Sequence, residues 1–279
     1  MPGQEIVEFL LIGLFVGTYG TLVGAGGGFI IVPILLIFFS AQFTTTQASG
    51  TSLFVVLCNG ISASLAFIRQ KKVDYATGWR FAAATVPSAF VGGLVANYFS
   101  SAAFKLVFGA LLIVVAFFLS LRPDPKKAKA LADPNKPLPP GFVRRTITIA
   151  TGQRYEYAFN LRSGIIFSFG IGFLSSILGV GGGIFMVPAM VFFFGFPAHL
   201  AAATSSFVLI FTALSGTLSH LIKGDVVFGP AIAMSAGVIV GAQIGAVISQ
   251  RVQGRAIVRF LSVALVLTGI QLIVKVFNP

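Results

Sequence analysis

Gly24-Ala25-Gly26-Gly27-Gly28-Phe29-Ile30-Ile31-Val32-Pro33 is a stretch that occurs twice in the chain, the second time as Gly179-Val180-Gly181-Gly182-Gly183-Ile184-Phe185-Met186-Val187-Pro188. Three later segments match in the same order: Gly50-Thr51-Ser52-Leu53-Phe54 with Ala203-Thr204-Ser205-Ser206-Phe207, Val73-Asp74 loosely with Asp225-Val226, and Val91–Ala96 with Val240–Gly245. Four matches in one register indicate an internal duplication. The sequence therefore predicts two homologous halves, residues 1–121 and 161–279.

The composition places both halves in a membrane. Of the 279 residues, 56% are hydrophobic and 9% are charged, and the mean hydropathy is +0.97. A soluble domain carries about 25% charged residues. Spans need about 20 apolar residues each, and the apolar runs are long and unbroken, so we expect an all-α polytopic membrane protein. The predicted full spans are 48–68, 79–99, 105–121, 201–222, 228–249 and 257–276.

Two further apolar stretches, 9–40 and 161–196, contain the glycine clusters. Each is longer than one span and shorter than two. A glycine costs about 1 kcal/mol inside a helix and a proline about 3 kcal/mol, so three adjacent glycines break the helix. We expect two short helices that meet in mid-membrane in each half, with Pro33 and Pro188 in the opening turns of the second ones.

The charge distribution bears on the orientation of the halves. The formal net charge is +12, but 16 of the 19 Lys and Arg residues lie in the stretches 69–80, 122–162 and 249–259. Such clustering between apolar runs follows the positive-inside rule and excludes a nucleic-acid partner. If each broken pair returns to its starting side, the halves are inverted repeats and these stretches are cytoplasmic. If each crosses once, the tally becomes 15 against 4, so charge alone does not decide between the topologies. We favour inverted repeats, each with a broken helix pair and three further spans, because the loop with Arg251, Arg255 and Arg259 is then cytoplasmic.

A basic, Pro-rich segment, 122–160, joins the halves. Six prolines between 123 and 140 forbid a continuous helix, so we expect a cytoplasmic linker that attracts anionic lipid. The alternating pattern of 144–149 and 154–157 around Thr151-Gly152 predicts a small β-hairpin at its end.

The glycine breaks are the candidate substrate site. A helix that begins after Gly28 or Gly183 points its free N–H groups and the positive end of its dipole at the midplane, which suits a small anion. The alternative is close helix packing, which we expect of Gly13, Gly17, Gly20, Gly24, Gly237, Gly241 and Gly245. The candidate substrate-binding residues are Gly26, Gly27, Gly28, Thr51, Ser52, Asn59, Gly181, Gly182, Gly183, Thr204, Ser205 and Gln243.

Each polar member of this set has a structural alternative. The Thr and Ser hydroxyls either donate to an oxyanion or bond the carbonyl one turn earlier in their own helix. Asn59 and Gln243 either contact substrate or hold helices together. His220 either provides a protonatable coupling group or is an interfacial histidine.

Acidic residues are scarce. None of the seven lies at the centre of a predicted span, and Asp74 and Asp225, at span starts, are expected to cap helices. This pattern disfavours a cation substrate. No residue pattern indicates a catalytic constellation, a metal site or a cofactor, so we expect no enzyme.

The duplicated Gly24–Gly28 and Gly179–Gly183 motifs with Pro33 and Pro188, followed by Thr51-Ser52 and Thr204-Ser205, resemble the TauE/SafE sulfite-exporter family, also called the 4-toluene sulfonate uptake family. The resemblance covers nearly the whole chain except 122–160. It implies a multi-pass inner-membrane permease, by expectation an exporter, for sulfite, an organosulfonate or a related sulfur-containing oxyanion, moved by alternating access. An anion channel and a membrane sensor that uses 122–160 as its output stay open as alternatives, as does the oligomeric state.

Overall fold

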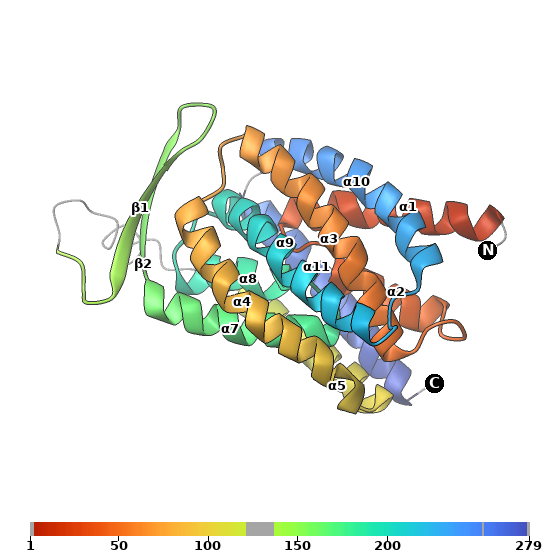
Figure 1. Cartoon of the computed structure of the whole chain (residues 1–279). Helices are drawn as coiled ribbons and strands as arrows, with labels where there is room; N and C mark the ends of the chain where they lie inside the picture. The colour runs from red at the N-terminus through yellow and green to blue at the C-terminus, as the bar shows by residue number, and fades with distance from the viewer. Residues whose placement is uncertain (1–2, 121–136, 253, 278–279) are drawn as a thin grey trace.

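A computed structural model describes residues 3–120, 137–252 and 254–277 (Figure 1). These residues form a helical bundle with one β-hairpin at its end. The first part contains α1 (Gly3–Val23), α2 (Gly28–Phe38), α3 (Thr45–Arg69), α4 (Tyr75–Val95), a 3-10 turn (Ala96–Tyr98) and α5 (Ser101–Ser120). The second contains β1 (Phe142–Thr148), β2 (Arg154–Asn160), α7 (Leu161–Leu178), α8 (Gly183–Pro188), a π-helical turn (Ala189–Phe193), α9 (Ala198–Ile222), α10 (Phe228–Arg251) and α11 (Gly254–Phe277).

Six of the described helices are long and apolar enough to cross a membrane, so the prediction of a polytopic helical membrane protein is confirmed at that level. They are α1, α3, α4, α7, α9 and α10. The predicted spans 105–121 and 257–276 fall on α5 and α11, whose apolar parts are the shorter Ser101–Phe117 and Leu261–Val274. Residues 122–136 of the predicted linker lie outside the described residues.

The glycine motifs break the chain where expected, but the two arms differ in length. The first arms, α1 and α7, have 21 and 18 residues, so the expectation of two short helices is wrong for them. The second arm α2 has 11 residues, and the ring of Phe9 in α1 contacts that of Phe39 beyond α2, with ring centroids 4.7 Å apart. Phe167 of α7 contacts Phe193 in the same way, at 5.4 Å. Each second arm therefore returns toward the start of its first arm.

The prolines lie deeper in the second arms than the opening turn. Pro33 and Pro188 are each the sixth residue of α2 and α8. A proline there has no N–H to donate to the turn before it. After Pro188 the helix widens into the π turn Ala189–Phe193, a common response to a disrupted hydrogen-bond ladder.

Glycines bring pairs of helices into backbone contact, as predicted for close packing. A Cβ on Gly237 of α10 would lie 2.1 Å from the Leu10 carbonyl oxygen of α1. A Cβ on Gly92 of α4 would lie 2.4 Å from the Phe173 carbonyl oxygen of α7. Only a residue without a side chain permits such an approach. The same holds for Gly13, Gly17, Gly20, Gly24, Gly241 and Gly245.

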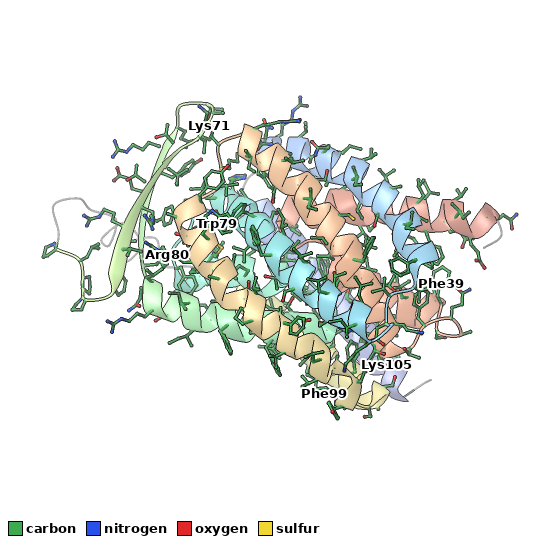
Figure 2. All side chains as sticks on the ribbon, in the orientation of Figure 1. Phe39, Lys71, Trp79, Arg80, Phe99 and Lys105 are labelled. Carbon is green, nitrogen blue, oxygen red and sulfur yellow. The ribbon has the colours of Figure 1, made fainter. Side chains whose placement is uncertain are left out.

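The long helices connect two ends of the bundle, which we call the hairpin end and the terminal end. Figure 2 places Lys71, Trp79 and Arg80 at the hairpin end, and Phe39, Phe99 and Lys105 at the opposite end, where both chain termini lie (Figures 1 and 2). Helix α3 therefore runs toward the hairpin. Helix α9 runs away from it and is antiparallel to α3 (Figure 1).

The predicted hairpin is confirmed, and it is anchored to the bundle. Strands β1 and β2 pair antiparallel, with Phe142 opposite Asn160. The Tyr157 ring lies 4.1 Å from that of Phe196, just before α9. The Tyr157 hydroxyl donates to Asp74 Oδ2 at 2.9 Å, and Arg145 Nε lies 3.8 Å from the same oxygen. Asp74 also accepts from the Thr77 amide and so caps α4, as predicted.

Candidate functional site

The two glycine breaks have the same backbone conformation. Gly24, Gly26 and Gly27 have φ of +73°, +78° and +84°, and Gly179, Gly181 and Gly182 have +74°, +75° and +91°. These values lie in the left-handed region, which only glycine enters at low cost. The duplicated sequence therefore specifies a duplicated loop, and each loop ends where a second arm begins.

The two breaks touch each other in the core of the bundle. A Cβ on Gly28 would lie 2.7 Å from the Gly179 carbonyl oxygen, and one on Gly183 would lie 2.6 Å from the carbonyl carbon of Ala25. Helix α2 and the helical segment Gly183–Phe193 therefore begin next to each other. Their first N–H groups have no acceptor within their own helix.

Apolar side chains close the centre of this junction. A Cβ on Gly26 would lie 2.3 Å from Leu209 Cδ1, and one on Gly181 would lie 2.3 Å from Val56 Cγ1. Val56 and Leu209 are buried near the middles of α3 and α9. The junction is therefore sealed in this conformation, and a solute can pass only if α3 and α9 or the breaks move.

The four predicted hydroxyls bond main-chain groups across the halves. Ser52 Oγ donates to the Gly179 carbonyl oxygen at 2.7 Å, and Ser205 Oγ donates to that of Gly24 at 3.1 Å. Thr51 Oγ1 accepts from the amide of Val227 at 3.0 Å. Thr204 Oγ1 accepts from the amide of Asp74 at 3.0 Å. None of these bonds is the expected back-bond within one helix. The serines hold the breaks, and the threonines hold the starts of α4 and α10.

The two amides have different surroundings. Asn59 Nδ2 donates to the Gly26 carbonyl oxygen at 3.2 Å, and Asn59 Oδ1 accepts from Thr21 Oγ1 at 3.2 Å, so Asn59 supports the first break. Gln243 Nε2 instead donates to the carbonyl and hydroxyl oxygens of Ser62, at 2.7 and 2.8 Å, which ties α10 to α3. The structure brings Asn59 to the junction and places Gln243 between helices.

Sequence analysis missed three serines beside the second break. Ser49, Ser175 and Ser176 are buried, and their hydroxyls have no hydrogen-bond partner among the described residues. Ser175 Oγ lies 3.4 Å from the position of a Cβ on Gly182, and a Cβ on Gly179 would lie 2.8 Å from Ser49 Cβ. Their positions directly before Gly50 and shortly before Gly179 were the available signal.

His220 lies in the last turn of α9 and is buried among the helices. Its side chain is 0% exposed. Nδ1 lies 3.0 Å from Asp225 Oδ2, and Nε2 lies 3.1 Å from the Ser176 carbonyl oxygen. Asp225 does not cap α10 as expected, because the N-cap residue is Val227. The loop between α9 and α10 instead turns the carboxylate back onto the imidazole.

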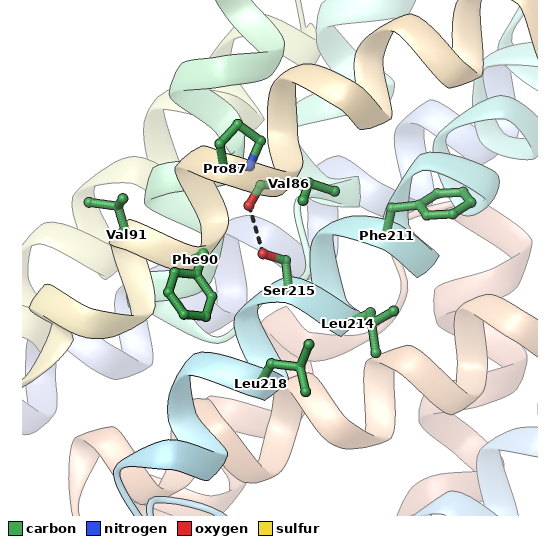
Figure 3. Close-up of a pocket in the computed structure, with 8 residues that line it drawn as sticks. All are labelled: Val86, Pro87, Phe90, Val91, Phe211, Leu214, Ser215 and Leu218. Carbon is green, nitrogen blue, oxygen red and sulfur yellow. Dashed lines mark hydrogen bonds between the residues drawn. The ribbon is translucent and has the colours of Figure 1, made fainter.

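A cavity between α4 and α9 is unsuited to an anion. Its volume is about 620 Å³, and Figure 3 shows that apolar side chains line it. Ser215 is the polar side chain among them, and its hydroxyl is already donated to the Val86 carbonyl oxygen at 2.6 Å. We therefore place the candidate site at the glycine junction. The lining residues are Val86, Pro87, Phe90, Val91, Phe211, Leu214, Ser215 and Leu218.

Comparisons with known proteins bear on this arrangement. The family model described as Sulfite exporter TauE/SafE matches residues 9–272. The chain is 37% identical over 275 residues to the probable membrane transporter protein YunE of Bacillus subtilis, covering 97% of this chain and 98% of that protein. It is 28% identical over 274 residues to a probable membrane transporter protein of Methanocaldococcus jannaschii, covering 94% and 92%. No solved structure matches. The chain therefore belongs to the TauE/SafE family of membrane transporters.

Proposed function

We propose that this protein is a permease for a small sulfur-containing oxyanion such as sulfite or an organosulfonate. The observation that carries the proposal is the contact between two matched helix breaks, Gly26–Gly28 and Gly181–Gly183, in the bundle core. Two helix starts present N–H groups and positive dipole ends there without a basic side chain. We name sulfite as a substrate because the matching family model is described as a sulfite exporter, and the same description suggests export as the direction.

The proposed mechanism is alternating access between two inverted repeats. Helices α3 and α9 are antiparallel (Figure 1), and their serines exchange equivalent bonds with the opposite break. Because Val56 and Leu209 seal the junction, we take this conformation to be occluded. Movement of one half against the other then opens the junction to one side at a time.

We propose that the protein lies in the inner membrane. In the proposed orientation, the hairpin end faces the cytoplasm. Lys71 and Arg80 lie at that end (Figure 2), and Arg145 on the hairpin adds to its positive charge. The terminal end carries Lys105 and the acidic Glu5 and Glu8 of α1. An excess of Lys and Arg marks the cytoplasmic side.

Flux measurements in proteoliposomes test the proposal. We expect saturable movement of sulfite or an organosulfonate, inhibited by the unlabelled anion, with none in liposomes without protein. Flux that does not saturate would indicate the alternative anion channel. No flux of any small sulfur anion from correctly folded protein would overturn the assignment.

A pair of glycine variants locates the path. Gly27→Leu combined with Gly182→Leu should abolish flux, because both positions have left-handed φ and a Gly27 side chain would collide with Val16. Gly170→Leu is the matched control, because nothing lies within 4 Å of a Cβ there. Since the double variant can fail to fold, Gly182→Ala, with neighbours no closer than 3.4 Å, serves as the milder change. Normal flux through a folded double variant would contradict the assignment of the substrate site to the glycine breaks.

A deletion in the linker distinguishes a permease from the alternative, a membrane sensor. Removing residues 124–134 and rejoining the chain leaves the hairpin and its anchors in place. A permease should keep its saturable flux, whereas a sensor that signals through this segment would lose its output.

A further inference from the structure

A buried histidine and a buried aspartate face each other next to the second glycine break. His220 lies in the last turn of α9 and Asp225 in the loop that follows. A Cβ on Gly50 of α3 would lie 3.0 Å from His220 Cβ and 2.9 Å from the Asp225 carbonyl oxygen. His220 Nε2 lies 3.1 Å from the carbonyl oxygen of Ser176 in α7. The pair thus sits where α3, α7 and α9 meet.

The two contacts of His220 require one dissociable proton. A carbonyl oxygen only accepts, so Nε2 must carry a hydrogen to bond Ser176. The contact between Nδ1 and Asp225 Oδ2, at 3.0 Å, then needs a second hydrogen, carried either by Nδ1 or by the carboxyl group. Both forms leave the pair with zero net charge. Loss of this proton leaves one negative charge and sets a nitrogen lone pair against an oxygen, so one of the two contacts must break.

The contact with Ser176 is made at a helix end. Ser176 belongs to the last turn of α7. The carbonyl oxygens of a last turn accept no hydrogen bond from an N–H group of their own helix, and they carry the negative end of its dipole. His220 therefore satisfies one free carbonyl just before Gly179. Asp225 and Lys223 are the charged residues next to His220 in the described chain, and Lys105 lies at the same end of the bundle (Figure 2). Lys223 Nζ is directed to the Leu94 carbonyl oxygen, and the facing residues of α3 and α7, Gly50 and Ser176, carry no charge.

The fold itself does not require a histidine at this place. Thr51 and Thr204 make equivalent bonds, as do Ser62 with Ile239 and Ser215 with Val86, so positions 153 apart correspond in these helices. By this correspondence Phe67, which is buried, stands where His220 stands in the other half, and Lys72 stands where Asp225 stands. One half packs an apolar ring and the other a titratable pair.

We propose that His220 and Asp225 form a one-proton latch that ties the end of α7 to α9, so that opening of the anion path at the terminal end is coupled to release of that proton. On release the proton passes to water, and the His220–Ser176 contact or the His220–Asp225 contact is lost. The second break is then free to separate from α9. This inference rests on the proposed transport function for its role, but the proton itself is a property of the protein alone.

The proton is measured first, on purified protein without any substrate. The chain has two histidines, so isotope-labelled histidine with infrared or NMR detection resolves His220 during a pH titration. We expect one proton step in the His220 signal, and we expect Asp225→Asn, which keeps the labelled ring, to abolish it because the pair titrates as a unit. His199→Gln is the control and should retain the step. Persistence of the step in Asp225→Asn would overturn the latch.

Transport provides the second measurement. In wild-type proteoliposomes a gradient of one pH unit should change anion accumulation about tenfold for one coupled proton. An asparagine amide at position 225 can donate to Nδ1 and keep both contacts without a labile proton, so Asp225→Asn should fold but hold this end closed, with at least a tenfold loss of flux. His220→Gln leaves Asp225 without its partner and should give flux that no longer responds to the gradient. Flux by Asp225→Asn that still follows the gradient would contradict the latch, whereas absence of wild-type flux would contradict only the proposed transport.

Discussion

Ser52 of α3 donates its hydroxyl to the carbonyl oxygen of Gly179 at 2.7 Å, although 127 residues separate them in the chain. Ser205 of α9 makes the equivalent bond to Gly24. Each half of the protein therefore holds the glycine break of the other half. A broken helix in lipid leaves main-chain groups without hydrogen-bond partners, at a cost of several kcal/mol each. The two serine hydroxyls replace some of these missing partners. The exchange makes each break depend on the position of the opposite half, as alternating access requires.

Ser52→Ala should weaken the protein by about 1 kcal/mol of unfolding free energy, because it leaves the buried Gly179 carbonyl without this donor. Ser205→Ala should act alike, and the pair should be close to additive. Ser206→Ala is the control, since its hydroxyl bonds the Ala202 carbonyl within the same helix. Thermal unfolding in one detergent measures all three. Equal stability of Ser52→Ala and wild type would show that the cross-half bond is not a support of the break.

The glycine contacts between α1 and α10 should be more sensitive. In Gly237→Ala the new methyl group would meet Leu10 and Leu14 main-chain atoms at 2.1 and 2.6 Å, so the two helices must separate. Overpacking of this kind costs about 1–3 kcal/mol. Gly170→Ala, which adds the same methyl group to open space on α7, should be neutral or slightly stabilising. The yield of monodisperse protein and its unfolding temperature compare the two. A stable Gly237→Ala variant would contradict the close packing.

Sequence reasoning succeeded where the signal is local and failed where it depends on packing. The two helix breaks were predicted from the Gly24–Gly28 and Gly179–Gly183 motifs, and the hairpin from alternation around Gly152. The burial of His220 could not be foreseen, because it depends on the loop that returns Asp225 to the ring. The long first arms likewise depend on packing, because α1 lies against α10 and α7 lies against α4. Asn59 and Gln243 are both amides within predicted spans, so the sequence does not distinguish them. In the structure Asn59 bonds a glycine break, whereas Gln243 bonds Ser62.

Tyr157→Phe should loosen the hairpin from the bundle. The Tyr157 hydroxyl donates to the buried Asp74 carboxylate, and a hydrogen bond to a charged group contributes about 1.5–3 kcal/mol. Burial, followed by the nearby Asp74 charge, raises the pKa of Tyr157 above its ordinary value of 10.0. The protonated phenol is thus favoured by folding, so its contribution is complete below pH 10 and is lost only as the pH rises beyond that value. The loss in Tyr157→Phe should therefore be constant from pH 6 to pH 9.

Limited proteolysis of the hairpin and thermal unfolding, each at pH 6 and pH 9, measure this loss. Tyr155→Phe is the matched control, because it removes a tyrosine hydroxyl from the same strand without touching the Asp74 cluster. Faster cleavage of Tyr157→Phe at both pH values is the expected result. Cleavage that matches wild type, or that differs only at pH 9, would contradict the role of this bond.

Ser175→Ala tests whether the free hydroxyls beside the second break serve the substrate. The Ser175 hydroxyl has no hydrogen-bond partner among the described residues, so its removal breaks no described contact and should leave stability unchanged. If the hydroxyl donates to an oxyanion at the junction, its loss removes about 0.5–1.5 kcal/mol of binding, which raises the KM for flux about twofold to twelvefold. Ser235→Ala is the control, because that hydroxyl is also buried and unpartnered in the described structure but lies on α10 away from the breaks. An unchanged KM in Ser175→Ala, with Ser235→Ala equal to wild type, would place the anion away from the second break. A raised KM in Ser175→Ala alone would place the substrate beside the second break, because Ser175 Oγ lies 3.4 Å from the Cβ position of Gly182.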